Sequence, residues 1–469
     1  MNYHVGMKIA FLAAIILCMA CSDKGPSAEE LLNNPQRNVV LNRDSLGAEY
    51  WLEVEKNETV QICLDSRVRE WKTSLTSKIV NDSCFAFIVP TLIGVNSINV
   101  KFPDSDSTYK INLAIGMKYL DFKNEETLYG NDQFQMYESK MVSVTGTYLV
   151  DEYPVTNCEI TLLMWDEIPL NPKDHQIEKE WSERKKSSLR NEKCDAHDSA
   201  ANMISLYMAM KYANARSIRE GLKPYYKFSA TKYRNIKMIE PESGEYDDSI
   251  INPRYQYVAI HYRDYNKQRK GPMHQYIIMS YDFSNHEEKA IHVSADSTSD
   301  GYRLPYYDEW MMLARGGEKK AMTPWCNNSA KIKDVTKYAR FAKYKEHVKT
   351  EPVGQLLSNG YGLYDVLGLV EEHVLLEDHN WLRPNPYIMI NPGGPERAEI
   401  CRPGDCPYCL KEGENCPSCL KGGGLFHDWK RINYSYRSED RYTGYSGGFR
   451  LIRNIGNNAK WTEVKSDKE

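Results

Sequence analysis

Alternating apolar and polar residues dominate the first quarter of the chain. Over residues 39–115 apolar residues recur at every second position, in runs that include Ile62, Val100 and Leu113. Turn-forming residues separate the runs, and several short strands at this spacing are typical of an all-β sandwich. We therefore predict a small immunoglobulin-like β-sandwich over residues 38–118, without site chemistry of its own.

The remainder of the chain mixes helical and strand-like patterns. Apolar residues at three- and four-residue steps predict a helix over residues 201–218, capped by Asp198 or Ser199 and ended by Gly221. A second, short helix is expected to open at Pro305 and to end at residues 316–317. Strand-like runs cover residues 146–159, 255–262 and 274–281. This pattern predicts an α+β domain over residues 121–456, followed by a polar tail over 457–469.

The N-terminus has the pattern of a targeting signal. An apolar run at residues 9–19 follows Lys8, and it is too short to cross a bilayer. It ends in Ala20-Cys21, which resembles a bacterial lipobox. We predict a lipoprotein signal peptide over residues 1–20, lipid attachment at Cys21 and a tether over 21–37. An ordinary signal peptide cleaved near Ala20 is the alternative.

These features set the expected location and partners. The protein is expected to be exported and anchored by lipid to the bacterial cell envelope, at the outer membrane. A formal net charge of -4 with 26% charged residues gives no indication of a nucleic-acid partner. The expected partners are the membrane, through lipid on Cys21, and envelope proteins or glycans.

An exported location favours disulfides among the remaining cysteines. Cys63 and Cys84 are the natural pair in the predicted sandwich. However, Cys63 has the opposite parity to Ile62 and Leu64, which places it on the outer face of its strand. The sequence leaves both a bridge and its absence open.

A second group of cysteines is crowded near the C-terminus. Two C-P-x-C knuckles six residues apart contain Cys406, Cys409, Cys416 and Cys419, and Cys401 precedes them. Four thiolates at this spacing could hold zinc or iron tetrahedrally. The same residues could instead form disulfides or redox-active dithiols.

A series of motifs then points to a family. In chain order they lie at residues 153–157, 200–225, 302–317, 323–326, 352–354, 359–373, 422–423 and 448–451. Together they resemble the formylglycine-generating enzyme family, also called the sulfatase-modifying factor domain. The resemblance implies a low-regularity α+β fold related to C-type lectins. The resemblance does not extend to the predicted N-terminal sandwich.

The matching residues are mostly scaffold. They include Arg303, Trp310, Gly362, Glu372 and Arg450. Arg303 precedes a helix opened by proline, so we expect it to be a buried anchor near Asp308 or Glu309.

The family chemistry needs residues that this chain lacks. The resemblance implies copper bound by two cysteines, and the aligned positions hold His427 and Ile432. These two residues cannot form a soft dithiolate site, so copper is not expected. His427 and Asp428 are left as candidates for catalysis, and His373 and His427 as loose candidates for an iron site.

Calcium and zinc need different ligands from copper. The resemblance implies a calcium site, but Leu369 stands where the family has an asparagine, although Glu372 keeps the carboxylate. The donor set for calcium is therefore incomplete. The sequence does not fix a cofactor, and zinc at the Cys406–Cys419 cluster is one candidate.

The sequence thus predicts an envelope lipoprotein whose sulfatase-modifying-factor-type domain is a non-catalytic binding or structural module. The alternative is a formylglycine-generating or other metal-dependent oxidase that acts on a protein cysteine.

Overall fold

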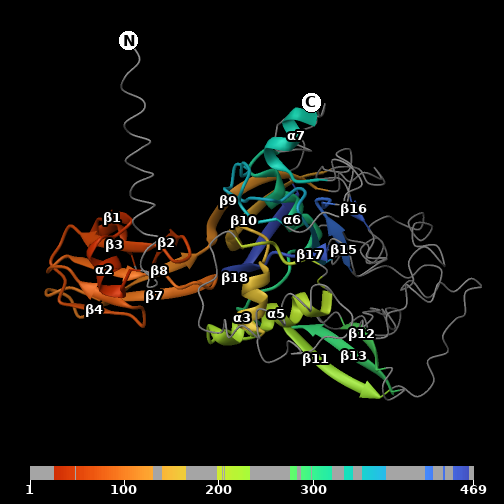
Figure 1. The fold of residues 1–469 in the computed structure, drawn as a ribbon, viewed down its shortest axis with the longest axis horizontal. Coiled ribbons are helices and arrows are strands. Elements are labelled where there is room, and N and C mark those ends of the chain that lie inside the picture. Colours follow the sequence, from red (N-terminus) through yellow and green to blue (C-terminus); the bar gives the residue numbers. More distant parts are fainter. Residues whose placement is uncertain are drawn as a thin grey trace, which may run out of the picture. The chain divides into compact units, whose positions relative to one another are not determined.

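The computed structural model describes residues 26–47, 49–129, 140–164, 198–202, 204, 206–232, 275–282, 287–296, 298–319, 332–341, 351–375, 418–425, 437–438 and 447–463. The chain divides into two compact units. The first comprises Met1–Pro90 and Asn96–Leu113, and the second comprises Thr91–Val95 and Ala114–Glu469. Figure 1 labels the main elements of both.

The first unit is rich in β-structure. Besides helix α2 (Ala28–Asn33) and a 3-10 turn (Arg43–Ser45), its elements are β1 (Arg37–Leu41), β2 (Glu49–Val54), β3 (Thr59–Leu64), β4 (Glu70–Lys72), β5 (Ser77–Ile79), β6 (Cys84–Ile88), β7 (Gly94–Lys101) and β8 (Thr108–Ile115). They form two four-stranded sheets, ordered β1-β3-β6-β5 and β2-β8-β7-β4. The first sheet is mixed, because β1 and β3 run parallel. The β-rich prediction is confirmed, and the immunoglobulin-like sandwich stays a prediction.

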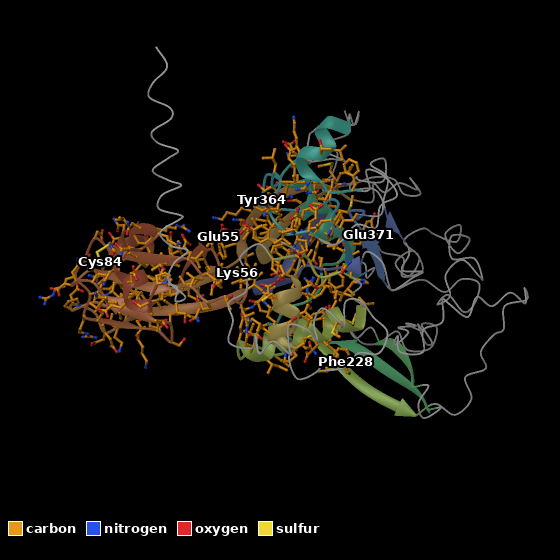
Figure 2. All side chains as sticks on the ribbon, in the orientation of Figure 1. Glu55, Lys56, Cys84, Phe228, Tyr364 and Glu371 are labelled. Atoms are coloured by element: carbon orange, nitrogen blue, oxygen red, sulfur yellow. A yellow bond between two sulfur atoms is a disulfide. The ribbon has the colours of Figure 1, made fainter. Side chains whose placement is uncertain are left out.

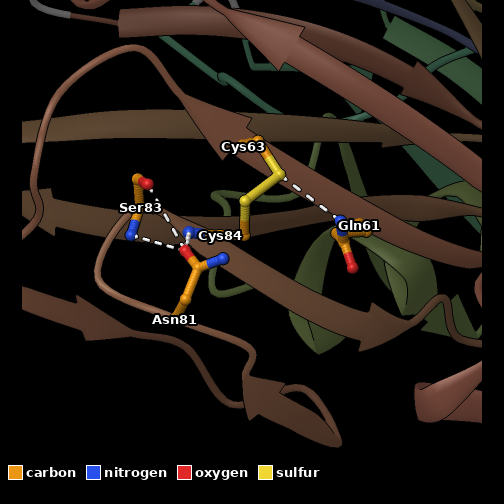
Figure 3. Close-up of a disulfide and its surroundings, with 5 residues drawn as sticks. All are labelled: Gln61, Cys63, Asn81, Ser83 and Cys84. Atoms are coloured by element: carbon orange, nitrogen blue, oxygen red, sulfur yellow. Dashed lines mark hydrogen bonds between the residues drawn. A yellow bond between two sulfur atoms is a disulfide. The ribbon is translucent and has the colours of Figure 1, made fainter.

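The disulfide between Cys63 and Cys84 is present. Strand β3 buries Val60 and Ile62 on one face, and Cys63 lies half-buried on the other, as its parity predicts. Cys63 is directly opposite Cys84 of antiparallel strand β6, so both side chains share that outer face. Figure 3 shows the bridge with its neighbours. The parity therefore did not argue against the bridge.

The second unit is an α+β domain of low regularity, as predicted. Its helices are α3 (Asn157–Leu163), α5 (Leu206–Arg219), α6 (Tyr307–Arg315) and α7 (Ile332–Tyr338). One sheet has the order β18-β10-β9, from Ile452–Glu463, Lys140–Asp151 and Met117–Tyr129. A second has the order β11-β13-β12, from Tyr226–Lys232, Glu287–Ala295 and Gln275–Asp282. A third, ordered β16-β15-β14-β17, contains Arg437–Ser438, Ser418–Lys421, Glu371–Leu375 and Gly447–Gly448.

The main core of this unit forms around helix α6. Trp310, Leu313 and Ala314 pack in one buried cluster with residues of β10, β14 and β18, among them Val144, Val374 and Ile452. Trp310 is only 1% exposed, and burying an aromatic side chain of this size contributes about 2–3 kcal/mol. Every residue of α6 from Asp308 to Arg315 is buried, so the helix lies inside the unit rather than on its surface.

Helix α6 begins and ends as its sequence predicts. The backbone N–H of Tyr306 donates to Glu309 Oε2 at 2.9 Å, which satisfies one free donor at the helix start. Gly316 ends the helix with φ 61°. The Asn359 side chain donates to the carbonyls of Leu313 and Ala314, so the last turn is also satisfied.

Two predicted boundaries are wrong. Helix α5 begins at Leu206 instead of near Asp198, because Ser199 and Ala200 form isolated β-bridges. The Asp198 carboxylate instead accepts from the backbone N–H of Cys158, at the first turn of α3. Strand β10 stops at Asp151 rather than continuing to residue 159. The chain there turns into α3, whose Thr156 and Glu159 form a capping box.

The two glycines that follow α5 and α6 provide a matched stability test. Both have positive φ, 71° at Gly221 and 61° at Gly316, so alanine costs about 1 kcal/mol at each. A Cβ at Gly221 meets nothing within 4 Å, whereas at Gly316 it would lie 2.6 Å from the backbone nitrogen of Gly360. We expect Gly316→Ala to cost about 1–3 kcal/mol more than Gly221→Ala in urea unfolding. Equal costs would contradict this packing.

Candidate functional site

The sheet β16-β15-β14-β17 contains three of the candidate residues, Glu372 and His373 on β14 and Cys419 on β15. Strand β15 contains Cys419, whose backbone pairs with Val374 of β14, and β17 runs parallel to β14 on its other side. Gly422 follows β15 at a point of close approach. A Cβ on Gly422 would lie 2.5 Å from the carbonyl oxygen of Val366 and 3.4 Å from the Trp310 ring. The turn after β15 therefore rests directly on the scaffold.

A buried arginine connects this sheet with the rest of the unit. Arg450, 1% exposed, bonds to both carboxylate oxygens of Glu372 at 2.6–2.9 Å. Its Nη1 also donates to the carbonyls of Asp151 and Glu152, at 3.1 and 3.3 Å. Its Nη2 donates to the carbonyl of Tyr364 at 2.8 Å, a residue labelled in Figure 2. Three separate segments are thereby fixed to one guanidinium.

The indole of Trp310 completes this arrangement. Its Nε1 donates to Glu372 Oε2 at 2.7 Å, while Arg450 holds both oxygens from the other side. Glu372 is fully buried, so no water competes for these bonds. A carboxylate engaged in this way is a structural anchor. The Glu372 carboxylate is therefore unsuited to bind calcium or to act as a general base.

Arg303 anchors a second buried network. Its guanidinium forms a two-point contact with Glu309, at 2.6 and 2.7 Å, as the sequence predicts for one of the two acids. Desolvation would lower the pKa of Arg303, but Glu309 outweighs it and the pKa is raised. Tyr148 donates to the same carboxylate at 3.2 Å, and burial raises the pKa of Tyr148 well above its usual value.

His373 also lies in this layer, on strand β14. Its Nε2 lies 2.6 Å from the carbonyl oxygen of Ile204, and because a carbonyl only accepts, Nε2 carries the proton. The other ring nitrogen, Nδ1, has no hydrogen-bond partner among the described residues, although His373 is 1% exposed. The loose assignment of His373 to an iron site stays a prediction. Within the described residues no group of three or more His, Cys, Asp or Glu is arranged to hold a metal.

Asp365 and Leu369, two of the four described non-glycine residues with positive φ, were missed by sequence reasoning. Asp365 has φ 52° and accepts from the backbone N–H of Gly354 at 2.6 Å, while burial raises the pKa of its carboxyl. Leu369 has φ 59° and packs in a buried cluster with Tyr153 and Val370. Such conformations cost about 1–3 kcal/mol and persist only where surrounding contacts impose them.

The predicted scaffold residues fall into three places. Trp310, Glu372 and Arg450 form one bonded group, and Arg303 is in the neighbouring network. Gly362 lies elsewhere, where a Cβ would meet the Lys118 side chain at 2.8 Å. Cys21, Cys406, Cys409, Cys416, His427, Asp428 and Ile432 lie outside the described residues. Of Cys419 only the backbone is described, and no described helix is long and apolar enough to cross a membrane.

These motifs on this framework agree with a comparison to known protein families. The sequence pattern of the family described as "Sulfatase-modifying factor enzyme 1-like domain" matches residues 117–455, well over half of the chain. The chain belongs to this family. The family resemblance and the low-regularity α+β domain predicted from the sequence are confirmed. The match begins after the last residue of the first unit, as predicted.

Individual relatives of the family domain are distant. The formylglycine-generating enzyme of Thermomonospora curvata is 35% identical over 120 residues, which cover 23% of this chain and 40% of that protein. The chaperone protein LppX of Paenibacillus barcinonensis is 25% identical over 181 residues, 36% of this chain and 49% of that protein. The chain thus spans half or less of the length of these relatives. Among solved structures, Treponema denticola variable protein 1 matches with 17% identity and a TM-score of 0.41, over 77% of this chain and 99% of its own.

The buried ion pair between Arg450 and Glu372 predicts that the free energy of unfolding depends strongly on Arg450. Arg450→Met leaves the buried Glu372 carboxylate without its cation, which costs about 3–5 kcal/mol. A matched control is Lys319→Met, which removes an ion pair with Glu126 whose side chains are 57% and 38% exposed. That change should cost less than about 1 kcal/mol. Urea unfolding measures both, and similar costs would contradict a central role for Arg450.

We expect low pH to destabilise the turn that leads from β13 to Arg303. Asp296 lies at the end of β13, and Lys223, Lys227 and Thr298 hold its pKa far below the usual range. A depressed pKa stabilises the fold above the unfolded value of about 4, and this contribution is lost as the pH falls below it. We expect Asp296→Asn to unfold more easily at pH 7 and to lose less stability between pH 4 and pH 2 than the unmodified chain. An identical pH dependence would refute this.

Proposed function

We propose that this chain is a binding or structural module of the sulfatase-modifying factor type that does not perform the oxidation known from the family. One observation carries the proposal. The motif alignment puts His427 and Ile432 where the family has its copper-binding cysteines, and no cysteine follows Cys419. Copper(I) prefers two soft thiolates, which these positions cannot supply.

The described scaffold supports this proposal. Two of its buried acids are already bonded to internal cations: Glu372 to Arg450, and Glu309 to Arg303. Trp310 and Tyr148 use further acceptor sites on the same two carboxylates. These groups stabilise the framework, and they are not poised to hold a metal or to move a proton. Chemistry of the domain would have to come from other segments.

The proposed location is the cell envelope, with the protein anchored through lipid on Cys21. The motif at Ala20-Cys21 and the apolar run before it support this. The similarity to a protein named as a chaperone favours a protein partner over a glycan. The Cys406–Cys419 cluster is proposed to bind zinc or to form disulfides, with redox-active dithiols as the third alternative, and the first two roles would brace the segment before Gly422.

The second candidate is a copper-dependent oxidase that converts a protein cysteine to formylglycine. The similarity to a formylglycine-generating enzyme, 35% identical over 120 residues, favours it. His427 and Asp428 would then have to take the catalytic role.

Copper titration of the full-length chain in detergent separates the two candidates. We expect no tight copper(I) binding that depends on residues 424–432, and no oxygen consumption with a peptide containing C-x-P-x-R. As a positive control, a double variant with His427→Cys and Ile432→Cys should acquire a copper(I) site, because it restores two thiolates at the family spacing. Copper-dependent formylglycine formation by the unmodified chain would disprove the proposal.

The cysteine cluster needs a separate measurement. Zinc content and a thiol count on the chain isolated from its own membrane distinguish the two roles. Zinc removal by a chelator should free four thiols if the cluster binds metal. Four cysteines that react only after reduction would indicate disulfides instead.

A further inference from the structure

The mixed sheet of the first unit ends in a short strand whose outer side is open. Strand β5 is last in the order β1-β3-β6-β5, and among the described residues it pairs only with β6. The carbonyl of Thr76 and the N–H of Val80 both bond to β6. Because bonded residues alternate along an antiparallel pair, Ser77 and Ile79 direct their N–H and C=O groups away from β6. The outer edge of β5 is therefore a row of unpaired backbone groups.

An exposed apolar side chain lies at this edge. Ile79 is directly opposite Phe85 of β6, so both side chains are on the face of the sheet that is turned to the core. Phe85 is 3% exposed, whereas Ile79 is 61% exposed, because no further strand follows β5. Ile79 thus lacks the cover that a neighbouring strand would supply.

A tryptophan of the other sheet lies against the same phenylalanine. Trp71 belongs to β4, the edge strand in the order β2-β8-β7-β4. It is half-buried and stacks on Phe85, with ring centroids 5.1 Å apart. Its Nε1 atom is buried and has no hydrogen-bond partner in the described part of the chain. This side of the unit therefore combines unpaired backbone, an exposed aliphatic side chain and an indole donor without an acceptor.

The opposite edge of the same sheet, strand β1, is built differently. Its exposed apolar residue is Val40, which is opposite Cys63 and therefore on the outer face. Arg37 Nη1 donates to the carbonyl of Glu53 in β2 at 2.9 Å, so a side chain joins this edge to the other sheet. Of these two edges, β5 is the one that places an exposed apolar residue on the core-facing side.

A lysine in the middle of β5 determines which strand can pair there. Lys78 is exposed, and its Nζ donates to Asn33 Oδ1 at 2.6 Å, an uncharged group. No acid in the described part of the chain forms an ion pair with it. If the β5 strands of two copies paired around a two-fold axis, their Lys78 residues would lie directly opposite each other, and like charges there destabilise the pair. An acidic residue opposite Lys78 is favoured instead.

We propose that the outer edge of β5 binds an extended segment of a partner protein, which adds to the sheet as a further strand. The segment has an acidic residue opposite Lys78 and an apolar residue on each side of it. These two apolar residues bond to the backbone of Ser77 and Ile79, so their side chains lie on the core-facing side next to Ile79. Backbone bonds give affinity, and the apolar-acidic-apolar pattern selects the partner. This inference does not rest on the proposed function of the second unit.

Calorimetric titration of the full-length chain in detergent tests this with three capped synthetic peptides. The first has the central sequence Val-Glu-Val, the second has Val-Lys-Val, and the third is the first peptide with N-methyl groups on both valines. We expect the first to bind with a Kd below about 1 mM and the second at least about fivefold more weakly. The third should bind at least about tenfold more weakly, because it lacks the backbone donors. No binding of the first peptide, or equal binding of the third, would overturn the proposal.

Variants locate the site, with far-UV circular dichroism to show that each one is folded. Lys78→Glu should invert the preference, so that the Val-Lys-Val peptide binds more tightly than the Val-Glu-Val peptide. Ile79→Ser should weaken binding of the Val-Glu-Val peptide at least about threefold. Val40→Ser, at the opposite edge and 78% exposed, is the matched control and should leave binding unchanged. An unchanged preference in Lys78→Glu would rule out β5, and a dimer of the unmodified chain that Ile79→Ser dissociates would identify a second copy as the occupant and overturn the proposal.

Discussion

The second unit depends on the buried guanidinium of Arg450. Its cation is surrounded by the Glu372 carboxylate and by carbonyls from the end of β10 and from Tyr364. These groups come from segments that are 78 to 299 residues away along the chain. Taking such an ion pair out of water is costly, and only a full set of bonds makes it tolerable. The arrangement therefore gives conformational specificity more than raw stability, and it fixes where the turn after β15 rests.

This constraint explains why the family framework and the family chemistry can separate. Arg450, Glu372 and Trp310 bond to one another and need no metal or substrate to be satisfied. A chain can lose the residues of the reactive segments without disturbing these bonds. Membership in the sulfatase-modifying factor family then says little about catalysis, because the motifs that identify the family are largely the motifs that build its core.

Local patterns in the sequence predicted the features that neighbouring residues determine, such as helix ends and strand faces. The start and end of α6 follow from Glu309 and Gly316, and the face of Cys63 follows from strand parity. Even the pairing of Arg303 with Glu309 spans only six residues. The partners of Arg450 could not be predicted in this way, since no local pattern encodes a contact 299 residues away. The predicted start of α5 was wrong for a related reason. Ser199 and Ala200 form backbone bridges with distant segments.

The central claim is that the framework is retained without a sulfur pair able to hold a redox ion beside Phe426 and His427. Crystals of the chain soaked with silver(I), a close mimic of copper(I), test this directly through anomalous scattering. The account predicts no silver coordinated by two sulfurs next to these residues. A linear two-sulfur silver complex there would contradict it.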